Sequence, residues 1–153
     1  MKLAEALMER KARKTRMEEL KQRIYRHAQV QEGEIAPEDP QELLEALSHE
    51  VEAFLALVAQ INHTNTRSRL PQGQTLTQAL IRRDMLRYLH LVHTNLGDKA
   101  CAPPNRYSKR EIKTLPSVDV ALLRKKTDAL ARDHRLLDLA IQGANWAVEL
   151  DEL

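Results

Sequence analysis

Apolar residues recur at alternating spacings of three and four along four separate stretches of the chain. The most regular row comprises Leu44, Leu47, Val51, Phe54, Val58 and Ile61. This spacing keeps side chains on one face of an α-helix, which turns once every ~3.6 residues. Four such rows predict four amphipathic helices that pack on one another.

We expect these helices at about residues 2–29, 40–62, 77–96 and 117–147. The other three rows are Leu3, Ala6, Arg10, Arg13, Met17, Leu20, Ile24 and His27; Ile81, Met85, Tyr88, Leu89, Val92 and Leu96; and Val120, Leu123, Thr127, Leu130, His134, Leu137, Ile141, Ala144 and Val148. In the first of these rows, the apolar pattern holds at both ends and fails at Arg10 and Arg13. Additional leucines widen each row, which is typical of a bundle in which a helix contacts more than one neighbour.

Residue types that begin and end helices occur near the expected boundaries. Asp39 followed by Pro40 favours a helix start, as does Ser117, and Thr75 or Thr77 can cap the third helix. Gly97 is expected to end that helix. The tail after Val148 is expected to fray.

A polar stretch separates the second helix from the third. Leu70-Pro71-Gln72-Gly73 predicts a tight turn, because Pro presets φ and Gly supplies a positive φ. We therefore expect a small β-hairpin over residues 64–76. Residues 107–115 are a candidate third strand that would join it.

Composition agrees with an all-α fold. Aromatic residues make up only 3% of the 153 residues, and there are four glycines, which disfavours a β-sandwich. A chain of this length is expected to form a single domain with its own core. The predicted fold is a mostly antiparallel bundle of four long helices.

The sequence also suggests a compartment. Cys101 is the only cysteine, which excludes an internal disulfide and a cysteine zinc cluster. No stretch is apolar and long enough to be a membrane span or a secretory leader. We expect a cytoplasmic protein.

Charge is distributed in blocks along the chain. Residues 1–26 carry nine basic and four acidic residues, whereas residues 27–66 carry eight acidic residues and no Lys or Arg. Such blocks favour pairing between neighbouring antiparallel helices. Residues 9–16, ERKARKTR, allow a second interpretation, a strip for nucleic acid or anionic lipid, although no aromatic residue is interleaved and no specific nucleic-acid signal is present.

The densest set of ligand-binding side chains surrounds the polar stretch. Guanidinium forks, amides and a helix N-terminus are suited to a phosphate or carboxylate. The alternative is a structural network that satisfies helix ends. The candidate residues are Asn62, Asn65, Thr66, Arg67, Arg69, Arg83, Asp84, Arg106, Tyr107, Lys113, Asn145 and Trp146.

No catalytic or metal site is predicted. The sequence has no P-loop, GxGxxG, GxSxG or HExxH motif, and no nucleophile stands beside a general base. His90 and His93 share a helix face but lack the Glu-x-x-His pattern of a di-metal bundle. We expect neither enzymatic activity nor a cofactor.

Several segments of the sequence resemble the septicolysin-like family of small bacterial helical proteins. They are QEG (31–33), PEDPQELL (37–44), INHTNTRSRL (61–70), TLTQALIRRDMLR (75–87), RYSKREIKTLPSVDVALL (106–123) and QGANWAVEL (142–150). The resemblance implies no established activity, and only the family name implies a lytic toxin. From the residues themselves we expect an interaction or assembly protein that forms a homo-oligomer, with an anion- or nucleotide-binding module as the alternative.

Overall fold

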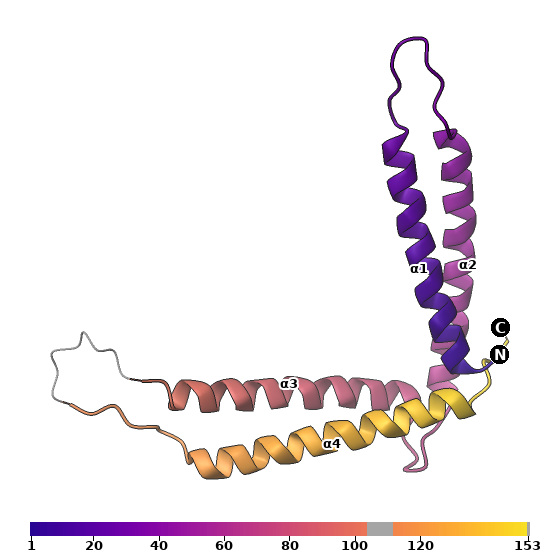
Figure 1. Ribbon diagram of the computed structural model, residues 1–153. Helices are drawn as coiled ribbons and strands as arrows, with labels where there is room; N and C mark the ends of the chain where they lie inside the picture. The colour runs from indigo at the N-terminus through magenta and orange to yellow at the C-terminus, as the bar shows by residue number, and fades with distance from the viewer. Residues whose placement is uncertain (104–111, 153) are drawn as a thin grey trace. The chain divides into compact units, whose positions relative to one another are not determined.

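The chain is all-helical in its computed structural model, which describes residues 1–103 and 112–152. Four helices occur among these residues (Figure 1): α1 (Leu3–Arg26), α2 (Pro40–Arg67), α3 (Leu76–Ala100) and α4 (Val120–Ala147). The prediction of an all-α fold with four long helices is confirmed.

The chain divides into two compact units. The first unit contains Met1–Arg69 and Gly143–Leu153, and the second contains Leu70–Gln142. Each unit is built on a pair of long helices, because an amphipathic helix must cover its apolar face with another element.

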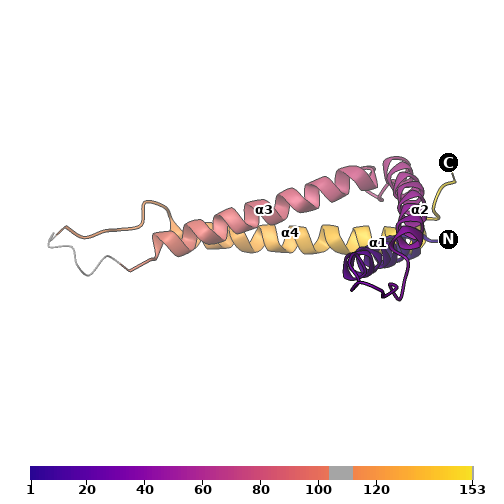
Figure 2. The same cartoon turned by 90° about the horizontal axis from the view of Figure 1, so that it is seen from above.

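In the first unit, α1 and α2 run antiparallel and side by side (Figures 1 and 2). The predicted rows face each other, so that Leu3 and Ala6 of α1 and Ile61 of α2 are at most 1% exposed. The charge blocks meet at one point between these helices, where Arg13 Nη1 lies 2.9 Å from Glu50 Oε1.

Two of the expected helix starts are confirmed. The Asp39 carboxylate accepts a hydrogen bond from the Gln41 backbone N–H at 2.8 Å, with Pro40 as the first helical residue. At α3, the Thr75 hydroxyl accepts from the Gln78 N–H, and the Gln78 side chain accepts from the Thr75 N–H. This reciprocal capping box satisfies two of the free donors at the helix end.

The expected β-hairpin is absent from the described residues. Instead, α2 continues to Arg67, and the Thr64 and Thr66 hydroxyls donate to the carbonyls of Gln60 and His63 within the helix. The turn is present, with the Gly73 N–H donating to the Leu70 carbonyl and a Gly73 φ of 89°, and the Leu70 N–H donates to the Gln74 carbonyl at 2.9 Å, but no strand forms on either side. The candidate third strand over residues 107–115 is not seen. Residues 107–111 lie outside the described residues, and residues 112–115 form no strand.

In the second unit, α3 and α4 run antiparallel (Figures 1 and 2). Arg83, near the start of α3, forms an ion pair of 3.3 Å with Asp138, near the end of α4. Gly97 does not end α3, which continues to Ala100. A Cβ at Gly97 would lie 3.7 Å from Leu123 Cδ2, an ordinary van der Waals distance, so this side of α3 faces α4.

The start of α4 also differs from the prediction. The helix begins at Val120, and the Asp119 carboxylate, not Ser117, accepts from a first-turn N–H, that of Leu122, at 3.0 Å. Asp and Ser are equally good caps. Because α4 begins at Val120 and not at residue 117, Asp119 is the residue next to its first turn.

The structure shows which face of α3 meets α4. The apolar row, expected to be either central in the bundle or an oligomer interface, is exposed, whereas Arg83, Leu86, His90 and Gly97 are half-buried. One neighbouring helix covers one face only. The ion pair from Arg83 to Asp138 shows that the face of α3 that contains Arg83 contacts α4. The apolar row therefore lies on another side of the helix.

Candidate functional site

The predicted polar cluster is divided between the two units. The first unit holds Asn62, Asn65, Thr66, Arg67, Arg69, Asn145 and Trp146. The second holds Arg83, Asp84 and Lys113, and Lys113 is exposed in a segment without regular structure. Arg106 and Tyr107 lie outside the described residues. Whether the cluster binds a ligand stays a prediction.

A hydrogen-bonded junction stands at the end of α2. Thr64 is fully buried, and its hydroxyl donates to the Gln60 carbonyl at 2.8 Å and accepts from the Asp151 N–H at 3.0 Å. The Asp151 carboxylate lies 3.6 Å from Arg67 Nε. Thr64 and Arg67 therefore hold the chain's last described residues against α2.

Residues 149–151 are held in place and do not fray as expected. The Leu3 N–H donates to the Val148 carbonyl at 2.9 Å, and the Leu150 N–H donates to the Met1 carbonyl at 2.8 Å. Between these bonds, the Glu149 carboxylate lies 2.5 Å from Lys2 Nζ. The hydrogen bond from Lys2 is the main cause that lowers the pKa of Glu149.

Sequence reasoning missed this pairing of the two ends. Lys2 and Glu149 are antiparallel bridge partners separated by most of the chain, and neither lies in an alternating strand pattern. A short polar tail is ordinarily disordered, so no local signal was available. The partners meet because the start of α1 lies beside the end of α4.

The remaining cluster residues of the first unit differ in exposure. Asn145 is buried, at 8% exposed, whereas Trp146 is 57% exposed and Asn62 is exposed. The Arg67 side chain is 70% exposed despite its contact with Asp151. These groups can donate hydrogen bonds, but none is a nucleophile next to a general base.

In the second unit, the Arg83 guanidinium already pairs with two carboxylates. Its guanidinium donates to Asp84 at 3.1 Å and 3.2 Å and to Asp138 at 3.3 Å. Two carboxylates largely compensate the positive charge, so this arginine is better suited to joining α3 and α4 than to capturing an anion.

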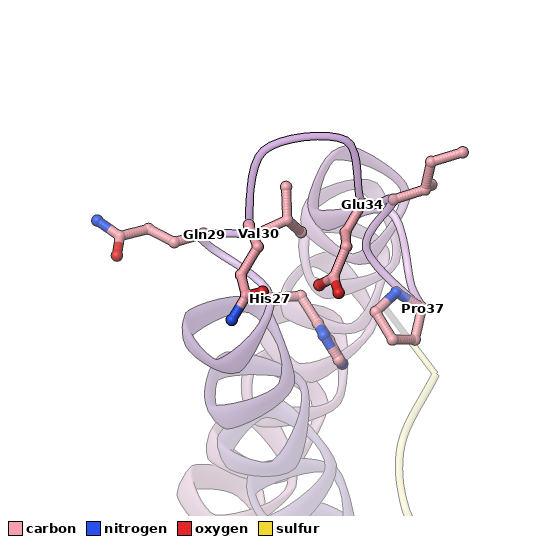
Figure 3. Close-up of a pocket in the computed structure, with 7 residues that line it drawn as sticks. His27, Gln29, Val30, Glu34 and Pro37 are labelled. Carbon is pink, nitrogen blue, oxygen red and sulfur yellow. The ribbon is translucent and has the colours of Figure 1, made fainter.

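A hollow of about 550 Å³ lies at the loop between α1 and α2. The side chains of His27, Glu34 and Pro37 border it, whereas the Gln29 side chain points away (Figure 3). Below it, His27 Nε2 lies 3.3 Å from Glu38, which also receives hydrogen bonds from Arg23. The hydrogen bond from Arg23 is the main cause that lowers the pKa of Glu38.

The basic strip of α1 is largely exposed. Only Arg13 of its five basic residues has an ion pair with a described residue, to Glu9 and to Glu50. The interpretation in which the strip pairs with α2 therefore holds for Arg13. Binding of nucleic acid or lipid by Arg10, Lys11, Lys14 and Arg16 stays a prediction.

The largest unexplained feature is the apolar row on α3. We call Ile81, Met85, Tyr88, Leu89, Val92 and Leu96 the α3 seam. Their exposed fractions range from 42% for Leu96 to 60% for Ile81 and Tyr88. Only Leu76 and Ala79, in the first turn of α3, are buried. Large apolar side chains in such a row ordinarily lie against a partner.

The described residues bear on two other classes of function, metal binding and membrane insertion. Within residues 1–103 and 112–152, no group of three or more His, Cys, Asp or Glu residues is placed to hold a metal ion. Over the same part of the chain, every helix is too short or too polar to cross a lipid bilayer.

Comparison with known proteins gives a family. The sequence pattern of a family of unknown function, DUF6847, matches residues 10–150. The chain belongs to this family. A solved structure described as a functionally unknown conserved protein from Corynebacterium diphtheriae is 38% identical, with a TM-score of 0.89 over 99% of each chain. No curated protein matches.

These comparisons establish no activity for the chain. The family is one of unknown function, and the neighbour is described in the same terms. The resemblance to septicolysin-like proteins, and the lytic activity implied by that name, are not tested by either finding and stay predictions.

Proposed function

We propose that this protein is a non-enzymatic assembly protein that self-associates through the α3 seam. The observation that carries the proposal is the half-exposed apolar row from Ile81 to Leu96. Its spacing of three and four is the spacing by which one helix packs on another. The row thus has the form of a helix interface whose second helix is supplied by another chain.

The size of the seam supports this function. Six side chains of these types, each roughly half exposed, leave on the order of 500 Å² of apolar surface, against about 800 Å² per partner in a standard interface. A patch of this size lies near the upper end of what monomers show, ~600 Å². Covering it, with the polar rim around it, suffices for a specific dimer.

A second copy of the chain is the partner that we infer. It offers a helix with the same apolar spacing, and α3 carries both signs of charge beside the seam, such as Arg82 and Asp84. A nucleic acid would instead require a continuous basic face. We also propose that the protein is not an enzyme, because the α3 seam consists of side chains suited to binding a second copy and not to catalysis.

Light scattering coupled to size exclusion tests the proposal. We expect an oligomer of at least twice the 17.6 kDa chain mass. Apolar burial is not screened by salt, so the oligomer should persist from low to high salt. A monomer at all accessible concentrations would overturn the proposal.

A substitution locates the interface. Met85→Glu places a charge in the middle of the seam and should dissociate the oligomer. Met8→Glu on α1 is the matched control, because Met8 is 56% exposed and Met85 is 53% exposed. The control should leave the mass unchanged. An oligomer that survives Met85→Glu, with helical content intact, would assign association to another surface.

A further inference from the structure

We infer that the two copies meet with their α3 helices antiparallel, related by a two-fold axis that passes between Tyr88 and Leu89. This inference rests on the proposed self-association and specifies its geometry. It makes the α3 seam a surface that is complementary to itself.

The positions of the seam residues carry the inference. About the point midway between Tyr88 and Leu89, Met85 mirrors Val92, and Ile81 mirrors Leu96. In a two-fold interface, a residue that contacts a second residue on the other copy is contacted by that residue in return. Reversing the helix therefore places every seam residue opposite another apolar seam residue.

The packing of α4 leaves the seam free for this contact. Arg83 and Gly97 mark the side of α3 that faces α4, through the ion pair to Asp138 and the contact with Leu123. At ~100° per residue, the centre of the seam lies roughly 140° around the helix from that side. A second α3 helix can approach without displacing α4, and the two helix pairs then form a four-helix layer.

Charge favours the antiparallel direction over the parallel one. Arg83 pairs with Asp138 on the side of α4. Beside it, the half of α3 before the axis carries Arg82 and Arg87 against Asp84, whereas the half after it carries only Asp98 and Lys99. A parallel pair would bring the arginine-rich halves together. The antiparallel pair sets each arginine-rich half against a neutral half, and it also opposes the two helix dipoles.

Cysteine crosslinking tests the direction. In a Cys101→Ser background, which removes the exposed native thiol, single cysteines are introduced and treated with a short bismaleimide. Leu89→Cys lies next to the axis and should give a covalent dimer. Ile81→Cys should not, since the two copies of residue 81 are separated by fifteen helical positions, about 22 Å.

A chain that carries both Ile81→Cys and Leu96→Cys should form the covalent dimer that Ile81→Cys alone does not. Tyr88→Cys serves as a second variant at the axis if Leu89→Cys weakens assembly. Light scattering on the same samples separates the two proposals. An oligomer in which Ile81→Cys links to itself would overturn the antiparallel arrangement and leave self-association standing. A monomer would overturn both.

Discussion

The Thr64 hydroxyl accepts a hydrogen bond of 3.0 Å from the backbone N–H of Asp151, a residue 87 positions further along the chain. Thr64 lies on α2, fully buried, where its hydroxyl also donates to the Gln60 carbonyl. One side chain thus joins the long helical pair of the first unit to the end of the described chain.

We expect Thr64→Val to destabilise the first unit. Valine keeps the shape of the side chain but leaves the Asp151 N–H without its acceptor, which typically costs about 1–3 kcal/mol. The free energy of unfolding in urea measures the loss. Thr66→Val is the control, because the exposed Thr66 hydroxyl, among the described residues, bonds only the His63 carbonyl. Equal effects from both substitutions would contradict a special role for the junction.

Acid should weaken the contact between α1 and the following loop. The hydrogen bond from Arg23 and the positive charge of that guanidinium, with a smaller contribution from His27, lower the pKa of Glu38. A carboxyl whose pKa is lower when folded stabilises the protein above its unfolded pKa of about 4.3, and this contribution is lost as the pH falls through the folded value. Glu38→Gln should therefore make the urea midpoint less sensitive to pH below about 4.3.

The control for this prediction is Glu52→Gln, on the exposed side of α2, where the carboxylate has no ion pair with a described residue. It should leave the acid dependence of the midpoint unchanged. If Glu38→Gln and the unsubstituted protein lost stability in parallel between pH 5 and pH 3, the contribution assigned to Glu38 would be wrong.

The core of the second unit is small, so its few buried side chains should be sensitive to truncation. Ile141 on α4 is 1% exposed, whereas Leu139, two residues earlier, is 63% exposed. Ile141→Ala should cost about 2–5 kcal/mol through lost burial and a cavity. Leu139→Ala should change the unfolding free energy by no more than about 0.5 kcal/mol. Similar losses would show that the buried face of α4 is assigned incorrectly.

Arg83 and Asp138 should be coupled, but weakly. Their side chains are 26% and 38% exposed, so water screens the pair. A double-mutant cycle of Arg83→Ala and Asp138→Ala should give a coupling of about 0.2–1 kcal/mol. Zero coupling, together with the loss of phosphate-induced thermal stabilisation in Arg83→Ala, would instead support a binding role for this arginine.

Local patterns were sufficient for the helices and for some of their ends. The rows from Leu3 to His27 and from Leu44 to Ile61 predicted the face by which α1 and α2 meet, since helical periodicity is a property of neighbouring residues. Asp39 and Thr75 were correct as caps for the same reason. The turn at Leu70 to Gly73 was also visible, because Pro and Gly restrict the backbone directly.

The sequence by itself determined four amphipathic helices, because spacing and capping act within a few residues. Only the tertiary structure decided which face of α3 meets α4, how far α2 continues, and where the tail after Val148 lies. Each of these depends on partners distant in sequence, Asp138 for Arg83 and Asp151 for Thr64. The apolar row from Ile81 to Leu96 was compatible with a central helix and with an oligomer interface, because periodicity reports that a face needs a partner and does not report which helix supplies it.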